Sequence, residues 1–199
     1  MTIQENPLFK EAIEFATFAH RTQKRKYTGE PYIQHPLKVA QCVADTYNDP
    51  DMVIAAALHD VVEDAFVSLD AIREKFGQLV CLYVLGLTSP SKQHPELKRD
   101  ERKKMDRNWL IMQPWQTVAI KLRDMQDNLH DLATQDPKFA KKYADEKLLD
   151  VLSIMDSRII PMDDESLRAA CEEIAKILDF PANWIYRRPF RVGPDLVMP

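Results

Sequence analysis

The residues with the clearest chemical potential follow an apolar run, 52–58, in the stretch M-V-I-A-A-A-L-H-D-V-V-E-D. Apolar residues on every side of a helix indicate that the helix is buried. Helical spacing would place Glu63 one turn beyond His59, and Asp64 one turn beyond Asp60. Buried carboxylates without a cationic partner are costly, so something positive must lie beside them. An imidazole among carboxylates favours a divalent metal. A buried ion pair with an Arg or Lys is the alternative.

Two other segments carry residue types that could join such a site. His35 precedes Pro36, and proline suits the first position of a helix. We therefore expect His35 at a helix N-cap, where its ring either caps the helix or points into the protein. Asp124 and Asn128 lie four residues apart, so they share one face of a helix. They could equally be ordinary surface residues.

Two basic stretches could contact an anionic ligand. Arg25 and Lys26 open the first, R-K-Y-T-G-E-P-Y-I-Q-H-P. In the second, K-R-D-E-R-K-K-M-D, the side chains of Arg99, Arg102 and Lys103 fall near one helical face. Both stretches could instead be solvated surface. The four glycines form no G-x-G-x-x-G or Walker-type loop, so any phosphate must be recognised by side chains and metal.

Helix signals dominate the elements that must position these residues. Proline recurs directly after a polar residue, as expected at helix starts, at positions 7, 36, 50, 114 and 137. Ser68 is a suitable N-cap for one helix. No segment alternates between apolar and polar residues over a strand's length, so we expect no sheet and an all-α fold. The expected helices cover about residues 7–24, 36–47, 50–63, 68–76, 78–88, 98–112, 114–133, 137–157 and 164–178.

The composition describes one globular domain. The 199 residues are 45% hydrophobic and 29% charged, which excludes disordered and fibrous classes. A formal net charge of −4 argues against general nucleic-acid binding. Three cysteines, Cys42, Cys81 and Cys171, show no C-x-x-C spacing and are expected to be reduced thiols. The N-terminus lacks signal-peptide features, and the longest apolar stretch, 79–87, is too short to span a membrane. We expect a cytoplasmic protein.

The order His35, then His59-Asp60, then Asp124 reproduces the H…HD…D signature of the HD-domain metal-dependent phosphohydrolases. The wider pattern is A-H-R-T-Q, R-K-Y-T-G-E-P-Y-I-Q-H-P, H-D-V-V-E-D and K-L-R-D-M-Q-D-N, over about residues 8–135. It resembles the hydrolase domain of the RelA/SpoT family. Within that family it is most similar to the stand-alone small alarmone hydrolases, which lack the synthetase domain. The resemblance implies a single-domain HD bundle of about eight to ten helices.

The resemblance also implies one bound divalent ion, Mn²⁺ in this family. Two imidazoles and two carboxylates would leave octahedral positions open for water and a substrate oxygen. Such an ion lowers the pKa of a bound water molecule. Because Mn²⁺ lowers it less than Zn²⁺ does, a nearby base is needed to take the proton. The four implied metal ligands are His35, His59, Asp60 and Asp124.

Glu63 and Asp64 match the family's catalytic acidic pair. They would position and deprotonate the water and handle the leaving group's proton, with the division of labour left open. The basic pair Arg25-Lys26 and Asn128 match residues that contact the nucleotide in this family. Arg99 and Arg102 match a basic stretch that would contact the pyrophosphate. In chain order the implied substrate-binding residues are Arg25, Lys26, Arg99, Arg102 and Asn128.

The chain departs from the family pattern at two positions. Thr22 stands where the family usually has Gly, so the turn after the first helix could differ. Arg123 replaces a usual small residue, and it either misses the site or adds a cation to it. We expect a hydrolase domain at residues 1–161. We expect 162–199 to form a C-terminal helix and an irregular tail packed on the same domain.

The expected function is hydrolysis of the 3′-pyrophosphate of (p)ppGpp to GDP or GTP plus pyrophosphate. The same hydrolysis of adenosine alarmones, or removal of the 2′-phosphate of NADPH, is the alternative within enzymes. A nucleotide-sensing module without turnover would be a non-enzymatic interpretation. A further hypothesis is an interaction protein that docks a partner through its Arg-rich tail, which is compatible with catalysis. The expected partner is a small nucleotide, not nucleic acid or membrane, and the oligomeric state is open.

Overall fold

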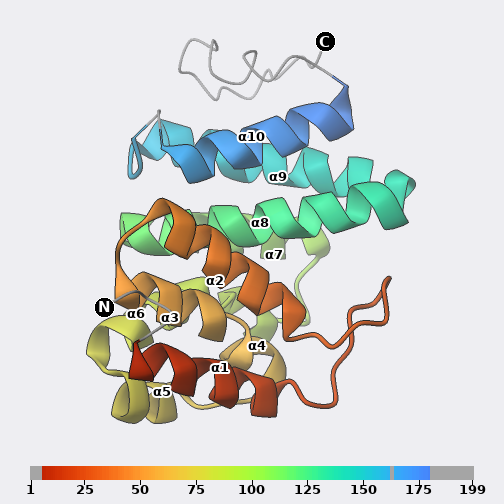
Figure 1. The fold of residues 1–199 in the computed structure, drawn as a ribbon. Coiled ribbons are helices and arrows are strands. Elements are labelled where there is room, and N and C mark those ends of the chain that lie inside the picture. The colour runs from red at the N-terminus through yellow and green to blue at the C-terminus, as the bar shows by residue number, and fades with distance from the viewer. Residues whose placement is uncertain (1–5, 162–163, 180–199) are drawn as a thin grey trace.

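The computed structural model describes residues 6–161 and 164–179, and most of this part of the chain is helical (Figure 1). It contains no β-strand, only an isolated bridge between Lys24 and Pro31. The all-α prediction is therefore confirmed. The helices are α1 (Pro7–Ala19), α2 (Gln34–Thr46), α3 (Pro50–Leu58), α4 (Val61–Ala65), α5 (Leu69–Phe76), α6 (Gln78–Leu87), the 3-10 helix η2 (Pro90–Gln93), α7 (Arg99–Leu110), α8 (Trp115–Gln135), α9 (Pro137–Ser157) and α10 (Glu165–Leu178).

The helices form two groups that meet at α8, which crosses the middle of the view in Figure 1. On one side α8 packs against α9 and α10. On the other side it packs against α2 and α6, and α3 packs against α1, α2 and α6. Every residue of Met52–Leu58 in α3 is buried, as its apolar sequence predicts. α3 is thus the core helix that carries His59 and Asp60 at its carboxyl end.

Two predicted boundaries near the site were wrong. The helix expected over 50–63 is two helices, because α3 ends at Leu58 and α4 begins at Val61. The Asp64 N–H still donates to the Asp60 carbonyl at 2.8 Å, so the expected spacing of one turn is kept. His35 is not an N-cap, because α2 begins one residue earlier, at Gln34.

The helix α2 begins earlier than predicted because a turn directly precedes it. The Gln34 N–H donates to the Pro31 carbonyl, and the His35 N–H donates to the Tyr32 carbonyl. These bonds extend the helix backward past the proline. The first helix is also shorter than expected, since α1 ends at Ala19 and a turned segment follows. Thr22 lies in that segment without a positive φ, so the position does not require glycine.

Capping by polar side chains explains most of the helix starts. Asn6, Asp49 and Asp136 each accept a backbone N–H ahead of a proline in the first turn. Ser68 Oγ accepts from the Ala71 N–H at 3.2 Å, which confirms it as an N-cap. At α8 the proline is itself the N-cap residue and the helix begins one residue later.

Arg123 points away from the site and ties three helices together. Its guanidinium is buried and donates to Thr46 Oγ1 at 2.6 Å in α2, and it lies 3.2 Å from Glu165 Oε1 in α10. Of the two outcomes that the sequence left open, this chain shows the first. The departure at 123 therefore adds no cation to the site.

The C-terminal helix α10 packs against α8 and α9. Residues 162–163 and 180–199 lie outside the described residues, and with them the arginines of the tail at 187, 188 and 191. No helix in 6–161 or 164–179 has the length and apolarity that crossing a bilayer demands. Cys42, Cys81 and Cys171 form no disulfide within the part of the chain that the structure describes.

Gly86 supports a close approach of α6 to the start of α8. A Cβ added there would lie 2.8 Å from Gln113 Oε1 and 2.8 Å from Thr117 Cγ2. Overpacking of this kind typically costs about 1–3 kcal/mol. It would outweigh the helix propensity gained by replacing Gly with Ala, which is about 1 kcal/mol. We expect Gly86→Ala to lower the free energy of unfolding in a urea titration.

The matched variant is Gly86→Ala combined with Thr117→Ser, which removes the methyl group in the way. It should recover part of the lost stability. Equal stability of Gly86→Ala and the parent would show that the α6–α8 contact relaxes without cost.

Candidate active site

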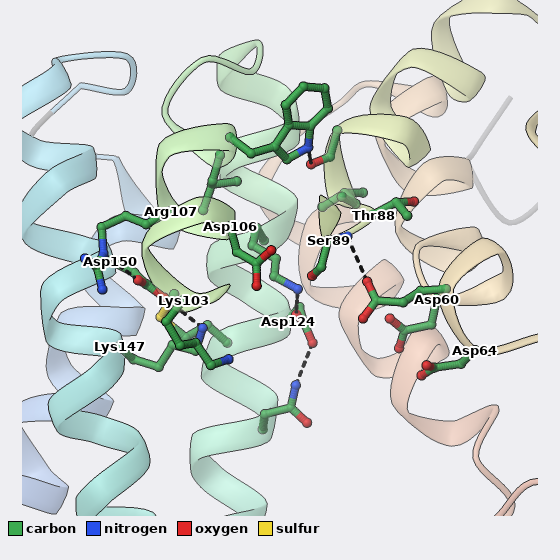
Figure 2. Close-up of a pocket in the computed structure, with 18 of the residues that line it drawn as sticks. Asp60, Asp64, Thr88, Ser89, Lys103, Asp106, Arg107, Asp124, Lys147 and Asp150 are labelled. Carbon is green, nitrogen blue, oxygen red and sulfur yellow. Dashed lines mark hydrogen bonds and ion pairs between the residues drawn. The ribbon is translucent and has the colours of Figure 1, made fainter. Parts of the chain in front are cut away.

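A polar pocket of about 240 Å³ opens between α4, α7, α8 and α9 (Figure 2). Carboxylates of α4 form one wall, and α8 contributes Asp124 between the walls. Basic residues of α7 and α9 form the opposite wall. The charged residues that line the pocket are Asp60, Glu63, Asp64, Lys103, Asp106, Arg107, Lys121, Asp124, Lys147 and Asp150.

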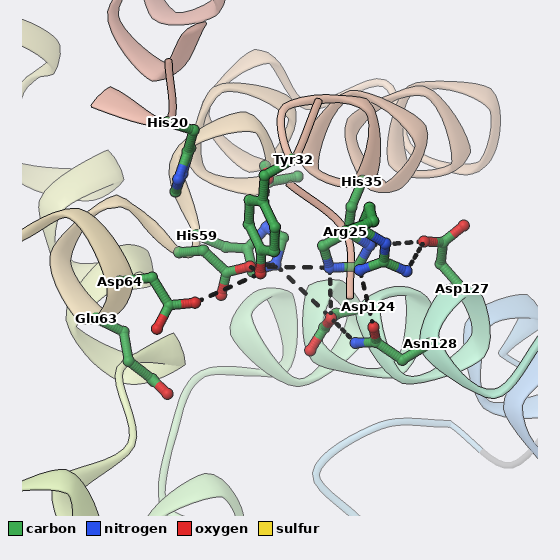
Figure 3. A network of polar contacts seen from close by, with 12 residues as sticks. His20, Arg25, Tyr32, His35, His59, Glu63, Asp64, Asp124, Asp127 and Asn128 are labelled. Atoms are coloured by element: carbon green, nitrogen blue, oxygen red, sulfur yellow. Dashed lines mark hydrogen bonds and ion pairs between the residues drawn. The ribbon is translucent and has the colours of Figure 1, made fainter. Parts of the chain in front are cut away.

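Four of the predicted residues converge at one edge of this pocket. One donor atom each of His35, His59 and Asp124 lies within 4.8 Å of the others. Asp60 Oδ2 lies 3.0 Å from His59 Nε2 and 3.8 Å from His35 Nε2. His35 Nε2 lies 3.0 Å from Asp124 Oδ1. Three separate segments, α2, the α3–α4 junction and α8, therefore meet at one centre (Figure 3).

Both imidazole rings are held so that their Nε2 atoms face the centre. His59 Nδ1 donates to the Ala56 carbonyl at 2.8 Å, and His35 Nδ1 donates to Asp127 Oδ2 at 2.6 Å. His59 Nε2 is buried and has no hydrogen-bond partner in the described part of the chain. This is the arrangement that orients metal-binding histidines, since a bond at one ring nitrogen fixes the other as a ligand.

The two carboxylates of the centre are also oriented. The Tyr32 hydroxyl donates to Asp60 Oδ2 at 2.7 Å. Asp124 accepts from Asn128 Nδ2 at 2.6 Å, and its other oxygen lies 2.7 Å from Lys121 Nζ. Burial raises the pKa of the Tyr32 hydroxyl, and the charge of Asp60 raises it further, so the tyrosine stays a donor.

The electrostatics show that this centre attracts positive charge. Burial opposes protonation of both rings, yet neighbouring carboxylates outweigh it. Asp124 and Asp127 raise the pKa of His35, and Asp60 and Asp124 raise the pKa of His59. Burial favours a neutral Asp124, yet Lys121 and the two histidines hold its pKa well below the usual range. Carboxylates that stay ionised beside inward-facing imidazoles fit a divalent cation, which binds deprotonated ligands. The donor set therefore fits a divalent metal.

Glu63 and Asp64 lie on α4, beside the centre and in the same pocket. Glu63 Oε2 accepts from the Ser89 N–H at 2.9 Å. Lys92 Nζ, on η2, lies 3.1 Å from Glu63 Oε1 and 3.3 Å from Asp64 Oδ1. An ion pair thus exists for these two acids, but the Lys92 side chain is 56% exposed, so it is not the buried pair that the sequence left as an alternative. It does not account for the two imidazoles that face Asp60 and Asp124.

The A-H-R-T-Q motif supports the acidic pair from behind. His20 Nδ1 donates to Gln23 Oε1 at 2.7 Å. Gln23 Nε2 donates to the Asp64 carbonyl at 2.6 Å. The His20 ring also lies 5.0 Å from the Tyr32 ring, between centroids. The motif therefore fixes α4 and Tyr32 against each other.

A second pocket of about 320 Å³ adjoins the first and is more aromatic. Arg25 Nη2 lies 2.5 Å from Asp131 Oδ2, and Arg25 Nη1 donates to Asn128 Oδ1 at 3.2 Å. Lys26 Nζ lies 4.9 Å from the centre of the Tyr27 ring. The two pockets share three lining residues, Tyr32, Asn128 and Tyr143. Three of the predicted substrate-binding residues, Arg25, Lys26 and Asn128, thus surround one pocket.

Arg99 and Arg102 line neither pocket. Arg99 forms a bidentate ion pair with Glu146 of α9, in which Nε and Nη2 donate to Oε1 and Oε2 at 2.9 and 2.8 Å. Lys103 and Arg107 of the same helix do line the first pocket. They lie one and two turns beyond Arg99 on the same helical face, where α7 reaches the pocket. A role for Arg99 and Arg102 in pyrophosphate contact stays a prediction.

Several residues around the centre were not singled out from the sequence. Tyr32 lies inside the R-K-Y-T-G-E-P-Y motif, and Lys121 precedes Asp124 by one helical turn. The motifs around them could therefore have pointed to both residues. Asp127 follows Asp124 by three residues and had the same signal. Lys147 had none, because a lysine in an amphipathic helix predicts only a solvated face.

The comparisons with known proteins agree with this geometry. The HD domain family model matches residues 12–158. The chain is 35% identical over 132 residues to the Drosophila melanogaster guanosine-3′,5′-bis(diphosphate) 3′-pyrophosphohydrolase MESH1, covering 65% of this chain and 72% of that protein. It is 37% identical over 142 residues to the Aquifex aeolicus enzyme named guanosine-3′,5′-bis(diphosphate) 3′-pyrophosphohydrolase, covering 70% of this chain.

The chain spans only 20% of the Aquifex relative's length. Its structure superposes with a TM-score of 0.70 on a solved structure described as a metazoan ortholog of SpoT that hydrolyses ppGpp. That match has 28% sequence identity and covers 86% of this chain and 95% of the other. With a family model that matches most of its length, this chain belongs to the HD domain family.

Proposed function

We propose that this protein hydrolyses the 3′-pyrophosphate of guanosine alarmones, converting (p)ppGpp to GDP or GTP and pyrophosphate. The observation that carries the proposal is the convergence of two inward-facing imidazoles and two carboxylates beside a second acidic pair. The relatives named for this reaction support the choice of substrate. A cytoplasmic location and a small-nucleotide partner belong to the same proposal.

The four converging side chains would hold one divalent cation, which we propose to be Mn²⁺. When bound, the cation would act as a Lewis acid that polarises a phosphoryl oxygen and lowers the pKa of water. Around it, Tyr32 and Asn128 fix the carboxylate oxygens, while Asp127 and the Ala56 carbonyl fix the rings. The four ligands would be His35, His59, Asp60 and Asp124.

Glu63 and Asp64 would carry the proton transfers. A water oxygen attacks the phosphorus attached to the ribose 3′ oxygen, and the bond between that phosphorus and the 3′ oxygen breaks. One carboxylate takes the proton of the water, and the 3′ oxygen receives a proton as the nucleoside leaves. The Ser89 N–H holds Glu63 in place, and Lys92 lies within ion-pair distance of both acids.

The two pockets suggest how the nucleotide lies. The second pocket offers aromatic faces at Tyr27, Phe139 and Tyr143, with Arg25 beside them, which suits a base. The first pocket offers charged groups, which suit phosphates. Asn128 and Tyr143 line both, so the ribose would lie at the junction.

The proposal is tested with purified protein, Mn²⁺ and a panel of ppGpp, ppApp and NADPH. We expect hydrolysis of ppGpp to GDP and pyrophosphate, separated by anion-exchange chromatography, and loss of that hydrolysis when a chelator removes the metal. A faster reaction with ppApp or NADPH would replace the guanosine substrate by that nucleotide. Inertness toward all three with the metal bound would favour a nucleotide-sensing module and would overturn the proposal.

A further inference from the structure

One wall of the first pocket is basic and lies across from the acids of the metal centre. Lys103 and Arg107 of α7 and Lys147 of α9 line it. In Figure 2 these three side chains lie on the side opposite Asp60 and Asp64, with Asp124 between the two groups. The mechanism described above does not use this wall.

The positive charges of this wall exceed the negative charges that contact them. Asp150 is shared, because its Oδ1 lies 2.9 Å from Arg107 Nε and its Oδ2 lies 2.8 Å from Lys147 Nζ. Lys103 has no carboxylate within ion-pair distance among residues 6–161 and 164–179. Asp106 also lines the pocket, but it accepts the N–H and hydroxyl of Ser91 on η2. Arg107 and Lys147 therefore share one carboxylate, and Lys103 adds a third positive charge without one.

The direction of the pKa shift of Lys103 agrees with this imbalance. Burial and the like charge of Lys147 lower the pKa of the Lys103 amine, although the carboxylates of Glu146 and Asp150 pull it upward. Lys147 is itself buried, with its ammonium 5.4 Å from the centre of the Tyr143 ring. An anion that entered the pocket would relieve the repulsion between the two lysines.

The chemistry of the proposed substrate places an anion there. In a 3′-pyrophosphate ester the phosphorus that is attacked carries the ribose oxygen on one side and the second phosphoryl group on the other. The ribose is proposed to lie at Asn128 and Tyr143, and the attacked phosphorus beside Asp60 and Asp124. The second phosphoryl group must then extend into the remaining part of the pocket, where Lys103 lies.

We propose that Lys103, supported by Lys147, binds the terminal phosphoryl group of the 3′-pyrophosphate and thereby selects pyrophosphate esters over monophosphate esters. This inference rests on the proposed hydrolase function. It assigns the basic wall the binding of the second phosphoryl group, which neither the converging side chains nor the second pocket contacts. It also disfavours the 2′-phosphate of NADPH as the main substrate, because a monophosphate leaves Lys103 without a partner.

The test compares two substrates that differ only in the second 3′ phosphate, ppGpp and guanosine 5′-diphosphate 3′-monophosphate. The variant is Lys103→Gln. Loss of a charge-assisted contact to a phosphate typically lowers the affinity for the group that it binds by roughly 10- to 100-fold. We expect the ratio of kcat/KM for ppGpp to kcat/KM for the monophosphate to fall by about that factor. Lys103→Arg, which keeps the charge, should retain most of the ratio.

Lys104→Gln is the matched control, because Lys104 is exposed on the same helix and lines neither pocket. It removes the same charge and should leave the ratio unchanged. Circular dichroism of Lys103→Gln should match that of the parent, since the side chain has no carboxylate partner to lose. An unchanged ratio in folded Lys103→Gln, or an equal fall in Lys104→Gln, overturns the inference.

Calorimetric titration with inorganic pyrophosphate separates this inference from the function itself. Pyrophosphate should bind Lys103→Gln about 10- to 100-fold more weakly than it binds the parent, while the affinity for GDP stays within error. If the parent does not hydrolyse ppGpp, the proposed function fails, and the pyrophosphate titration still decides whether Lys103 forms an anion site. Equal pyrophosphate affinity in both proteins would contradict that site.

Discussion

Asp60→Asn is expected to lose divalent-metal binding and, with it, hydrolysis of ppGpp. The substitution keeps the size of the side chain and removes the charge that faces both imidazoles, at 3.0 and 3.8 Å. Metal ligands of this kind must be ionised, and an amide is a much weaker donor to a hard cation. The Tyr32 hydroxyl can still donate to the amide oxygen, so the local structure is kept.

Metal affinity is measured by titrating chelator-treated protein with Mn²⁺ and following the electron paramagnetic resonance signal of the free ion. Asp127 is not one of the four converging side chains but holds the His35 ring, so Asp127→Asn should weaken binding by only about 10- to 100-fold. Asp156→Asn is the matched control, since Asp156 is exposed on α9 and lines neither pocket. It should behave as the parent does. Parent-like affinity in Asp60→Asn would remove Asp60 from the ligand set.

Glu63→Gln is expected to keep the metal and lose the reaction. The amide oxygen can still accept the Ser89 N–H, whose bond to Glu63 is 2.9 Å long, so the side chain should stay in place. The variant lacks a group that can take a proton, and a lost general acid–base residue typically costs 10²–10⁴-fold in kcat, an order-of-magnitude range. Metal affinity should not change, because Glu63 is not among the four converging side chains.

The measurement is kcat with saturating ppGpp, alongside the Mn²⁺ titration. Glu74→Gln is the matched control, because Glu74 is exposed on α5 and away from both pockets. Normal turnover by Glu63→Gln would assign the proton transfers to Asp64 or to neither acid. A joint loss of metal and activity would instead make Glu63 a ligand.

The fold was predictable because local signals agree along the chain. Asn6, Asp49, Ser68 and Asp136 act as caps where the sequence suggests helix starts. The apolar run that ends at Leu58 predicts a buried core helix, which is what α3 is. The break between α3 and α4 was not predictable, because no Gly or Pro marks it.

The centre was predictable from the order of its residues, whereas the opposite wall was not. A histidine and an aspartate in adjacent positions, with a second histidine and a second aspartate at family spacing, predict from residue types and order alone the four side chains that converge in the structure. The basic stretch of α7 does not indicate which helical face meets the pocket, so it predicts Arg99 and Arg102 as readily as Lys103 and Arg107, which line it. Lys147 comes to the pocket only through the packing of α9 on α8, which no local pattern encodes.

The most direct test of the central claim is a crystal grown with Mn²⁺, with the ion located by its anomalous scattering. We predict one strong peak within coordination distance of Nε2 of His35 and His59 and of a carboxylate oxygen of Asp60 and Asp124. A peak elsewhere, or no peak at that centre while the protein hydrolyses ppGpp, would contradict the account.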